Sequence, residues 1–192
     1  MEILSMSNEY DRKKMLELCK NLWGKRALIP VIGSGFSFDT PTDNNGHIQS
    51  VAELRDVLLH YITQYSKYDA EEISDIGKQQ LSELASSFWD IFDRIPEDNV
   101  NEFYQYISTN FQNLSFFKEY QKAFLSIQWP CVFTLNYDTL IEDFSERYYP
   151  VIPFEKINKF HARDKTKLYK IHGDAKRYLS TGDSKYFILS RD

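Results

Sequence analysis

The sequence lacks the cysteine patterns that build disulfide frameworks or zinc sites. Its two cysteines, Cys19 and Cys131, lie far apart and form no Cys-x-x-Cys pair. Structural zinc and small disulfide scaffolds both depend on closely spaced cysteines. We therefore expect no metal and no disulfide, and this cysteine usage is typical of a cytoplasmic protein.

Long hydrophobic runs and an excess of positive charge are also absent. No apolar stretch approaches the roughly 18 residues that a membrane-spanning helix needs, and residues 1–14 carry early acidic residues rather than a signal-peptide core. The chain has 23 Lys and Arg against 28 Asp and Glu, giving a net charge of −5. Nucleic-acid-binding domains are usually basic, so we expect neither membrane attachment nor direct nucleic-acid binding.

The chain has the length of one domain, and helical periodicity dominates its middle. Its 192 residues can bury one sizeable core. A short helix is expected over 11–23, and residues from about 51 to 128 repeat apolar positions every three or four residues with no strand pattern. Ser50 and Glu53 form a capping-box signature at the start of this region. We expect a large helical block there, with its aromatic faces forming core.

Short apolar runs typical of buried strands lie on both sides of this helical block. They occupy 27–32, 130–135 and 168–171. Strands separated by helices indicate a parallel sheet. We therefore predict an α/β fold: a Rossmann-like parallel sheet with helices on both faces and a large helical insertion between the first and second confident strands.

Smaller features complete the expected order of elements. We expect a helix that carries Leu140, Ile141, Phe144 and Tyr148 and is stopped by Pro150. Residues 151–154 and 186–189 are predicted as two further short strands. The segment 39–49 is rich in Pro, Asn, Asp and Gly and should be an irregular loop near the glycine turn.

Each of the three strands predicted at 27–32, 130–135 and 168–171 ends in small or polar residues. The first runs into a glycine turn at 33–37 (GSGFS), the second into 136–138 (NYD) and the third into 172–174 (HGD). Ligands bind outside the carboxyl ends of strands in an open parallel sheet, so these three turns should converge. Gly33 and Gly35 lack Cβ and can take positive φ, which lets backbone N–H groups approach a phosphate.

Each of these residues also has a purely structural interpretation. The glycine turn can be an ordinary tight turn, and Phe38 stands where the dinucleotide fingerprint has a third glycine. His172 can be a general base, because its ordinary pKa is near 6.5, or a core histidine. Asn136 can orient a water or a ribose hydroxyl, and Asp138 can contact a ligand, or both can serve turn formation and helix capping.

Taken together, the three motifs resemble the sirtuin-like (SIR2) family. They stand in the family's order as Gly33-Ser34-Gly35-Phe36-Ser37, Thr134-Leu135-Asn136-Tyr137-Asp138 and Lys170-Ile171-His172-Gly173-Asp174. The resemblance spans about residues 28–192 and is nearest to the SIR2-like effectors of bacterial anti-phage defence, which consume NAD+. Deacylases of the family carry two Cys-x-x-Cys pairs and usually a Gln where Leu135 stands here. The family's later strands, on the adenosine side of the pocket, are not found.

The resemblance implies a single SIR2-like domain over 1–192 that acts as an NAD+ glycohydrolase. NAD+ would be the substrate, with no metal, and the expected products are nicotinamide and ADP-ribose. The implied catalytic residues are Asn136 and His172; the implied cofactor-binding residues are Gly33, Ser34, Gly35, Phe36, Ser37, Thr134, Tyr137, Asp138 and Gly173.

Control of NAD+ loss implies a homo-oligomer or a complex with a partner defence protein. The main alternative is a catalytically silent subunit that senses NAD+ or ADP-ribose or serves as a structural part of a defence complex. A second alternative, deacylation of acyl-lysine, is disfavoured by the missing cysteines.

Overall fold

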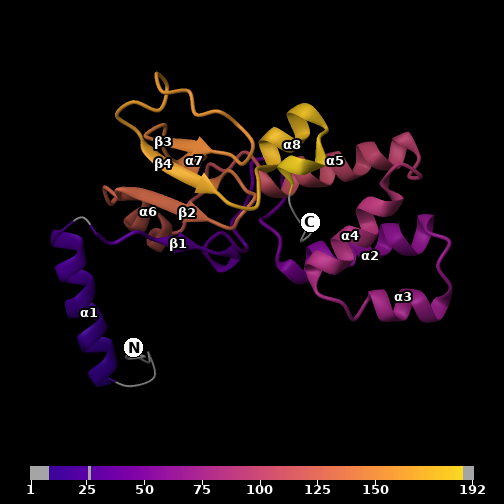
Figure 1. The fold of residues 1–192 in the computed structure, drawn as a ribbon, viewed down its shortest axis with the longest axis horizontal. Helices are drawn as coiled ribbons and strands as arrows, with labels where there is room; N and C mark the ends of the chain where they lie inside the picture. The colour runs from indigo at the N-terminus through magenta and orange to yellow at the C-terminus, as the bar shows by residue number, and fades with distance from the viewer. Residues whose placement is uncertain (1–8, 26, 188–192) are drawn as a thin grey trace.

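A four-stranded parallel sheet forms one half of the molecule. The computed structural model describes residues 9–25 and 27–187. Its strands are β1 (Val31–Ile32), β2 (Cys131–Thr134), β3 (Tyr148–Val151) and β4 (Thr166–Lys170), in the spatial order β1-β2-β4-β3 (Figure 1). All three neighbouring pairs are parallel. The predicted α/β class with a Rossmann-like parallel sheet is confirmed.

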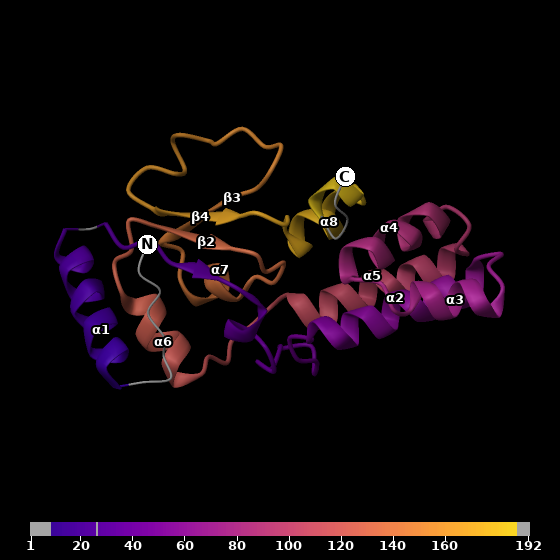
Figure 2. The same cartoon turned by 60° about the horizontal axis from the view of Figure 1, so that its bottom comes forward.

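Two helices cover one face of this sheet. Helices α6 (Glu119–Ser126) and α7 (Leu140–Phe144) lie beneath it in Figure 2. Alternation along β2 and β4 buries Val132 and Leu168 against Leu125 and Leu140, each fully buried. The opposite face of the sheet is less covered. There the rings of Phe133 and Tyr169 stack on each other at 4.7 Å and are only partly buried. Val31 in β1 is 67% exposed.

The predicted helical block forms a second core beside the sheet. Four of its helices form this core: α2 (Val51–Tyr65), α3 (Ala70–Ile76), α4 (Leu81–Phe92) and α5 (Glu97–Phe111), which lie to the right of the sheet in Figures 1 and 2. The last part of the predicted block, which forms α6, packs on the sheet instead. Buried aromatic side chains such as Phe88 and Phe103 fill this core. Helix α8 (Ala175–Thr181) joins it through Tyr178, whose ring lies 5.3 Å from Phe187.

The first helix, α1 (Glu9–Gly24), follows the expected position but contributes no buried residue. Its contact with the sheet side includes Trp23, whose ring meets Trp129 edge-on at 5.0 Å. Among the described residues, no helix is both long enough and apolar enough to cross a bilayer.

The prediction for residues 140–154 is wrong in its boundaries. Helix α7 ends at Phe144, and Tyr148 and Pro150 lie in β3 instead of a longer helix. A proline is tolerated there because β3 is an edge strand, where a missing N–H disturbs no ladder. The strand predicted at 151–154 keeps only Val151, and Phe154 has a positive φ of 67°.

The prediction for the last segment also differs from the structure. Tyr186 belongs to a short 3₁₀ helix, η2 (Ser184–Tyr186), and Phe187 forms an isolated bridge with Gly173. The rest of the predicted strand, 188–189, lies outside the described residues. Helix α8 was not predicted; Asp174 caps it by accepting a hydrogen bond from the N–H of Arg177 at 2.7 Å.

Candidate functional site

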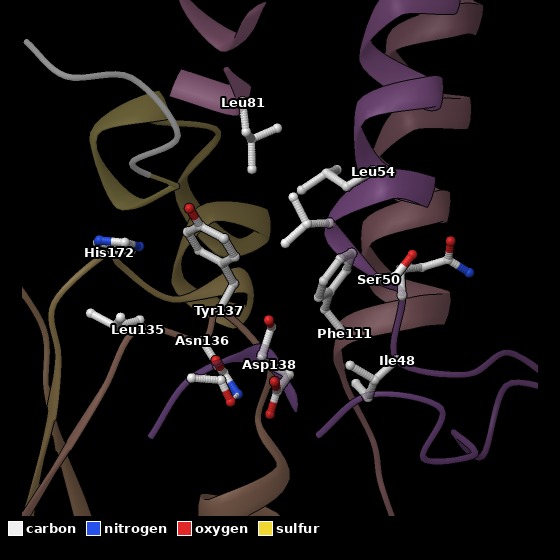
Figure 3. A pocket seen from close by; sticks show the side chains of 14 residues that line it. Ile48, Ser50, Leu54, Leu81, Phe111, Leu135, Asn136, Tyr137, Asp138 and His172 are labelled. Atoms are coloured by element: carbon white, nitrogen blue, oxygen red, sulfur yellow. Dashed lines mark hydrogen bonds between the residues drawn. The ribbon is translucent and has the colours of Figure 1, made fainter. Parts of the chain in front are cut away.

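The ends of β1, β2 and β4 meet at one cavity of about 300 Å³ between the sheet and the helical block (Figure 3). The sequence-predicted residues that line it are Gly33, Ser34, Asn136, Tyr137, Asp138 and His172. The other predicted residues, Gly35, Phe36, Ser37, Thr134 and Gly173, are not part of this lining. The parallel register places Ile32 beside Thr134 and Thr134 beside Lys170, which is why the three turns converge.

The glycine turn differs from the expected geometry. Gly33 has an extended φ of −115°, and neither it nor Gly35 is among the glycines with positive φ. A Cβ added at either position would meet no atom within 4 Å, so the turn faces open space. Residues 34–36 form a short 3₁₀ helix, η1 (Ser34–Phe36). Within the described chain, the backbone N–H groups of Ser34 and Gly35 have no hydrogen-bond acceptor.

The two remaining residues of the glycine turn point into protein. The ring of Phe36 packs 5.1 Å from that of Phe124 on the sheet side. Ser37 is 1% exposed, and its hydroxyl accepts a hydrogen bond from Asn136 Nδ2 at 3.0 Å. Both residues therefore hold the turn in place.

Asn136 connects the turn after β2 to the glycine turn. Its Nδ2 also donates to the carbonyl of Gly33 at 3.2 Å, and its backbone N–H donates to Thr134 Oγ1 at 3.0 Å. No described residue donates to the carboxamide oxygen of Asn136. Asn136 is 8% exposed, so this oxygen belongs to a positioned, nearly buried group at the cavity wall.

Asp138 accepts a hydrogen bond from the first turn of α7 and also lines the cavity. Its Oδ1 accepts a hydrogen bond from the N–H of Leu140 at 3.1 Å at the start of α7. Burial raises the pKa of this carboxyl, while the Lys170 ammonium and hydrogen bonds from Leu140 and Ser37 oppose the rise. Asp138 therefore has a structural contact with α7 and a place in the cavity lining at the same time.

His172 lies at the cavity on the side of β4. Its ring stands 6.1 Å from that of Tyr137, and among the described residues none makes a hydrogen bond to it. Desolvation by burial lowers the pKa of His172 below its ordinary value. The imidazole is therefore neutral at pH 7, the form that can accept a proton.

Gly173 has a structural role next to His172. Its φ is +98°, and a Cβ at this position would lie 2.2 Å from the carbonyl oxygen of Tyr186. Only glycine tolerates both conditions. The glycine of the His-Gly pair therefore allows the chain after β4 to pass close to the segment at 186–187.

Sequence reasoning missed the wall that the helical block contributes. Apolar side chains from the helical block, Leu54, Leu81 and Phe111, close the cavity on the side opposite the strand ends (Figure 3). The additional lining residues are Ile48, Gln49, Ser50, Val51, Leu54, Leu81, Phe111 and Leu135. The loop composition of 39–49 was the only signal, since helical periodicity marks buried positions without saying what lies across from them.

Polar groups line the cavity at the strand ends, and apolar side chains of the helical block line the opposite side. Hydroxyl, carboxamide, imidazole and free backbone N–H groups come from the strand ends, and a planar ring could pack against the helical side chains. Among the described residues, no cluster of three or more His, Cys, Asp or Glu could hold a metal ion.

Comparison with known families agrees with this arrangement. A comparison with curated proteins gives no match. The model of the SIR2-like domain matches residues 130–192. The match includes the turns at 136–138 and 172–174, whereas the glycine turn and the helical block lie outside it. The predicted resemblance is thus confirmed over residues 130–192, which match a SIR2-like domain.

Proposed function

We propose that this chain binds NAD+ in the cavity and hydrolyses its N-glycosidic bond. The observation that carries the proposal is that His172, Asn136 and the first two residues of the glycine turn, Gly33 and Ser34, line one cavity although up to about 140 residues separate them. The reaction joins NAD+ and water to give nicotinamide, ADP-ribose and a proton. No metal or second cofactor takes part in it.

The glycine turn would bind the pyrophosphate. The N–H groups of Ser34 and Gly35 have no acceptor in the described chain, and the missing Cβ atoms leave room for phosphate oxygens. The hydroxyl of Ser34 is a further donor at the cavity. The nicotinamide ring would pack against the apolar wall from the helical block.

His172 and Asn136 would carry the chemical step. Neutral His172 would accept a proton from the attacking water or a ribose hydroxyl, and the carboxamide oxygen of Asn136 would orient that water. Cleavage passes through an oxocarbenium-like transition state, and the nicotinamide leaves without protonation because its ring nitrogen is already cationic. Asp138 would contact the nicotinamide amide and favour the positive charge on the ribose.

The test is nicotinamide release from NAD+ by the purified chain, alone and with the products of neighbouring genes. We expect His172→Ala to lower kcat by at least about 100-fold. His161→Ala, which changes an exposed loop histidine, is the matched control and should leave the rate unchanged. A His172→Ala variant that cleaves NAD+ at the wild-type rate would refute the role of His172.

The pH dependence of cleavage provides a second check. A general base works when deprotonated, and burial lowers the pKa of His172 from its ordinary value near 6.5. We therefore expect kcat to be near its maximum at neutral and higher pH and to fall as the pH drops through the lowered pKa of His172. A rate that still rises between pH 7 and 8 would contradict this assignment.

A binding protein without turnover is the second candidate. It is favoured by the absence, within the described chain, of a hydrogen-bonding partner that would orient the ring of His172, since catalytic imidazoles are usually held by a third group. Calorimetry that shows NAD+ or ADP-ribose binding, with no nicotinamide released in any combination of partners, would select this candidate.

We also propose a cytoplasmic role in anti-phage defence, by analogy with SIR2-like effectors. Unrestrained NAD+ loss harms the cell that expresses the enzyme, so an activating partner or oligomerisation would be needed. Size-exclusion chromatography with light scattering, with and without phage infection of the source cells, would test this.

A further inference from the structure

We infer that Lys170 is a positioning residue whose buried ammonium joins the turn at 136–138 to the turn at 172–174. The inference rests on the proposed function, because its consequence is the alignment of the groups that would act on NAD+. Lys170 is the last residue of β4 and does not line the cavity. The residue is not among those predicted from the sequence to bind or cleave NAD+.

The ammonium of Lys170 contacts four different groups from three segments. Its Nζ donates to the carbonyl oxygens of Asp138 at 2.7 Å and Tyr137 at 3.3 Å in the turn after β2. It also lies 2.8 Å from Glu142 Oε1 on α7 and forms an ion pair with the carboxylate of Asp174 at the start of α8. An ammonium has only three protons, so all its donor capacity is used inside the protein.

Burial makes this arrangement costly, and the carboxylates offset the cost. The Lys170 side chain is 0% exposed, against 18% for Glu142 and 5% for Asp174. Burial lowers the pKa of Lys170, but Glu142 and Asp174 raise it by more, so the amine stays protonated. Asp138 is the third buried carboxylate near this ammonium. A buried ion pair of this kind is often no more stable than an apolar replacement of similar volume, which favours a role in specifying geometry.

The contacts of Lys170 act on both halves of the proposed machinery. The carbonyls that it binds belong to the residues that follow Asn136, so they set the direction in which the Asn136 carboxamide leaves the chain. Asp174 is two residues after His172, and its Oδ1 accepts from the N–H of Arg177 at the start of α8. Because a misplacement of about 1 Å can cost 100-fold in rate, one ammonium that fixes both turns can control catalysis without contacting substrate.

A double variant that leaves the net charge unchanged distinguishes the positioning role of Lys170 from the destabilising effect of leaving a buried charge without its partner. Lys170→Met alone would leave carboxylates buried without a partner and can fail to fold. Lys170→Met/Asp174→Asn removes the ammonium and the more buried of its two ion-pair partners, keeps similar volumes, and leaves an asparagine that can still cap α8. Lys167→Met on the same strand is the control, because the hydrogen-bond partners of Lys167 Nζ within the described residues are the loop carbonyls of Ala162 and Lys165.

We expect the double variant to fold, to lower kcat at least about tenfold and to change KM less than about threefold. Amide hydrogen exchange should become faster in segments 136–138 and 172–174 together, while Lys167→Met behaves like wild type. A folded double variant with wild-type kcat and wild-type exchange in both turns would overturn the inference.

Two further outcomes remain decisive. If the wild-type chain releases no nicotinamide, the proposed function fails, and hydrogen exchange alone decides the role of Lys170. If the double variant does not fold, Asp174→Asn replaces it, since asparagine also caps a helix but loses the charge that pairs with Lys170. Wild-type kcat and wild-type exchange at 136–138 and 172–174 in that variant would equally reject the inference.

Discussion

Gly35 follows β1 and Gly173 follows β4, and the two positions are glycine for different reasons. At Gly173 the backbone has φ of +98° and the carbonyl of Tyr186 occupies the space of a Cβ. At Gly35 the backbone strain is absent and the space is open. The fold therefore requires glycine at 173, whereas the structure leaves open space at Gly35, where we propose that a phosphate binds.

This difference predicts opposite effects for two equivalent substitutions. Gly173→Ala should lower the free energy of unfolding by about 2 kcal/mol or more, because both the φ and the contact are unfavourable. Gly35→Ala should change stability by less than about 1 kcal/mol and weaken binding of ADP-ribose. Urea unfolding and calorimetry measure the two effects; equal stability of the two variants would contradict the assignment of Gly173.

The first turn of helix α2 carries a capping box and also lines the cavity. Ser50 Oγ accepts from the N–H of Glu53 at 3.1 Å, and Glu53 Oε2 accepts from the N–H of Ser50 at 2.7 Å. This capping box fixes where the helix begins, and Ser50 and Leu54 both line the cavity. The first turn of α2 is therefore both a folding signal and a part of the cavity wall.

Loss of the cap should weaken the element. Ser50→Ala removes the hydroxyl that satisfies an N-terminal N–H and should cost about 1 kcal/mol of stability. Ser50→Thr keeps a hydroxyl and is the matched control. Thermal unfolding followed by circular dichroism would reveal the difference, and two variants of equal stability would show that the capping box does not hold α2.

Elements that are specified by local sequence patterns could be predicted from the sequence. The capping box and the aromatic periodicity of 81–92 are local patterns, and both elements formed as predicted. The prediction that the helix continues through residues 145–150 is wrong because Pro150 is tolerated in an edge strand as well as after a helix. That β3 is an edge strand is known only from the order of the strands in the sheet.

At the scale of the whole molecule, the cavity lies where two hydrophobic cores meet. One core is formed by α2, α4, α5 and α8, and the other by the sheet with α6 and α7. Residues from both halves line the cavity, among them Leu54 and Asn136. A ligand bound there contacts both cores, so binding should stabilise the molecule as a unit.

ADP-ribose should therefore raise the unfolding temperature in one transition. At 100 times its Kd, a ligand that binds only the folded state adds about 2.7 kcal/mol, which corresponds to a shift of about 5–10 °C for a chain of this size. His172→Ala should keep this shift, because His172 is assigned to chemistry rather than pyrophosphate binding. Calorimetry showing no shift with excess ADP-ribose would argue against a nucleotide site here.

Local chemistry in the sequence was sufficient for the parallel α/β class, the helical block and the three polar turns, because hydrophobic periodicity and strand-end residues depend on near neighbours. The SIR2-like match at 130–192 includes the sequence of two of those turns. The apolar wall of the cavity, the need for Gly173 and the four contacts of Lys170 depended on the tertiary fold. Each of them involves groups distant in the chain, such as Gly173 and Tyr186 or Asp138 and Lys170, and short-range patterns carry no information about which distant atoms will meet.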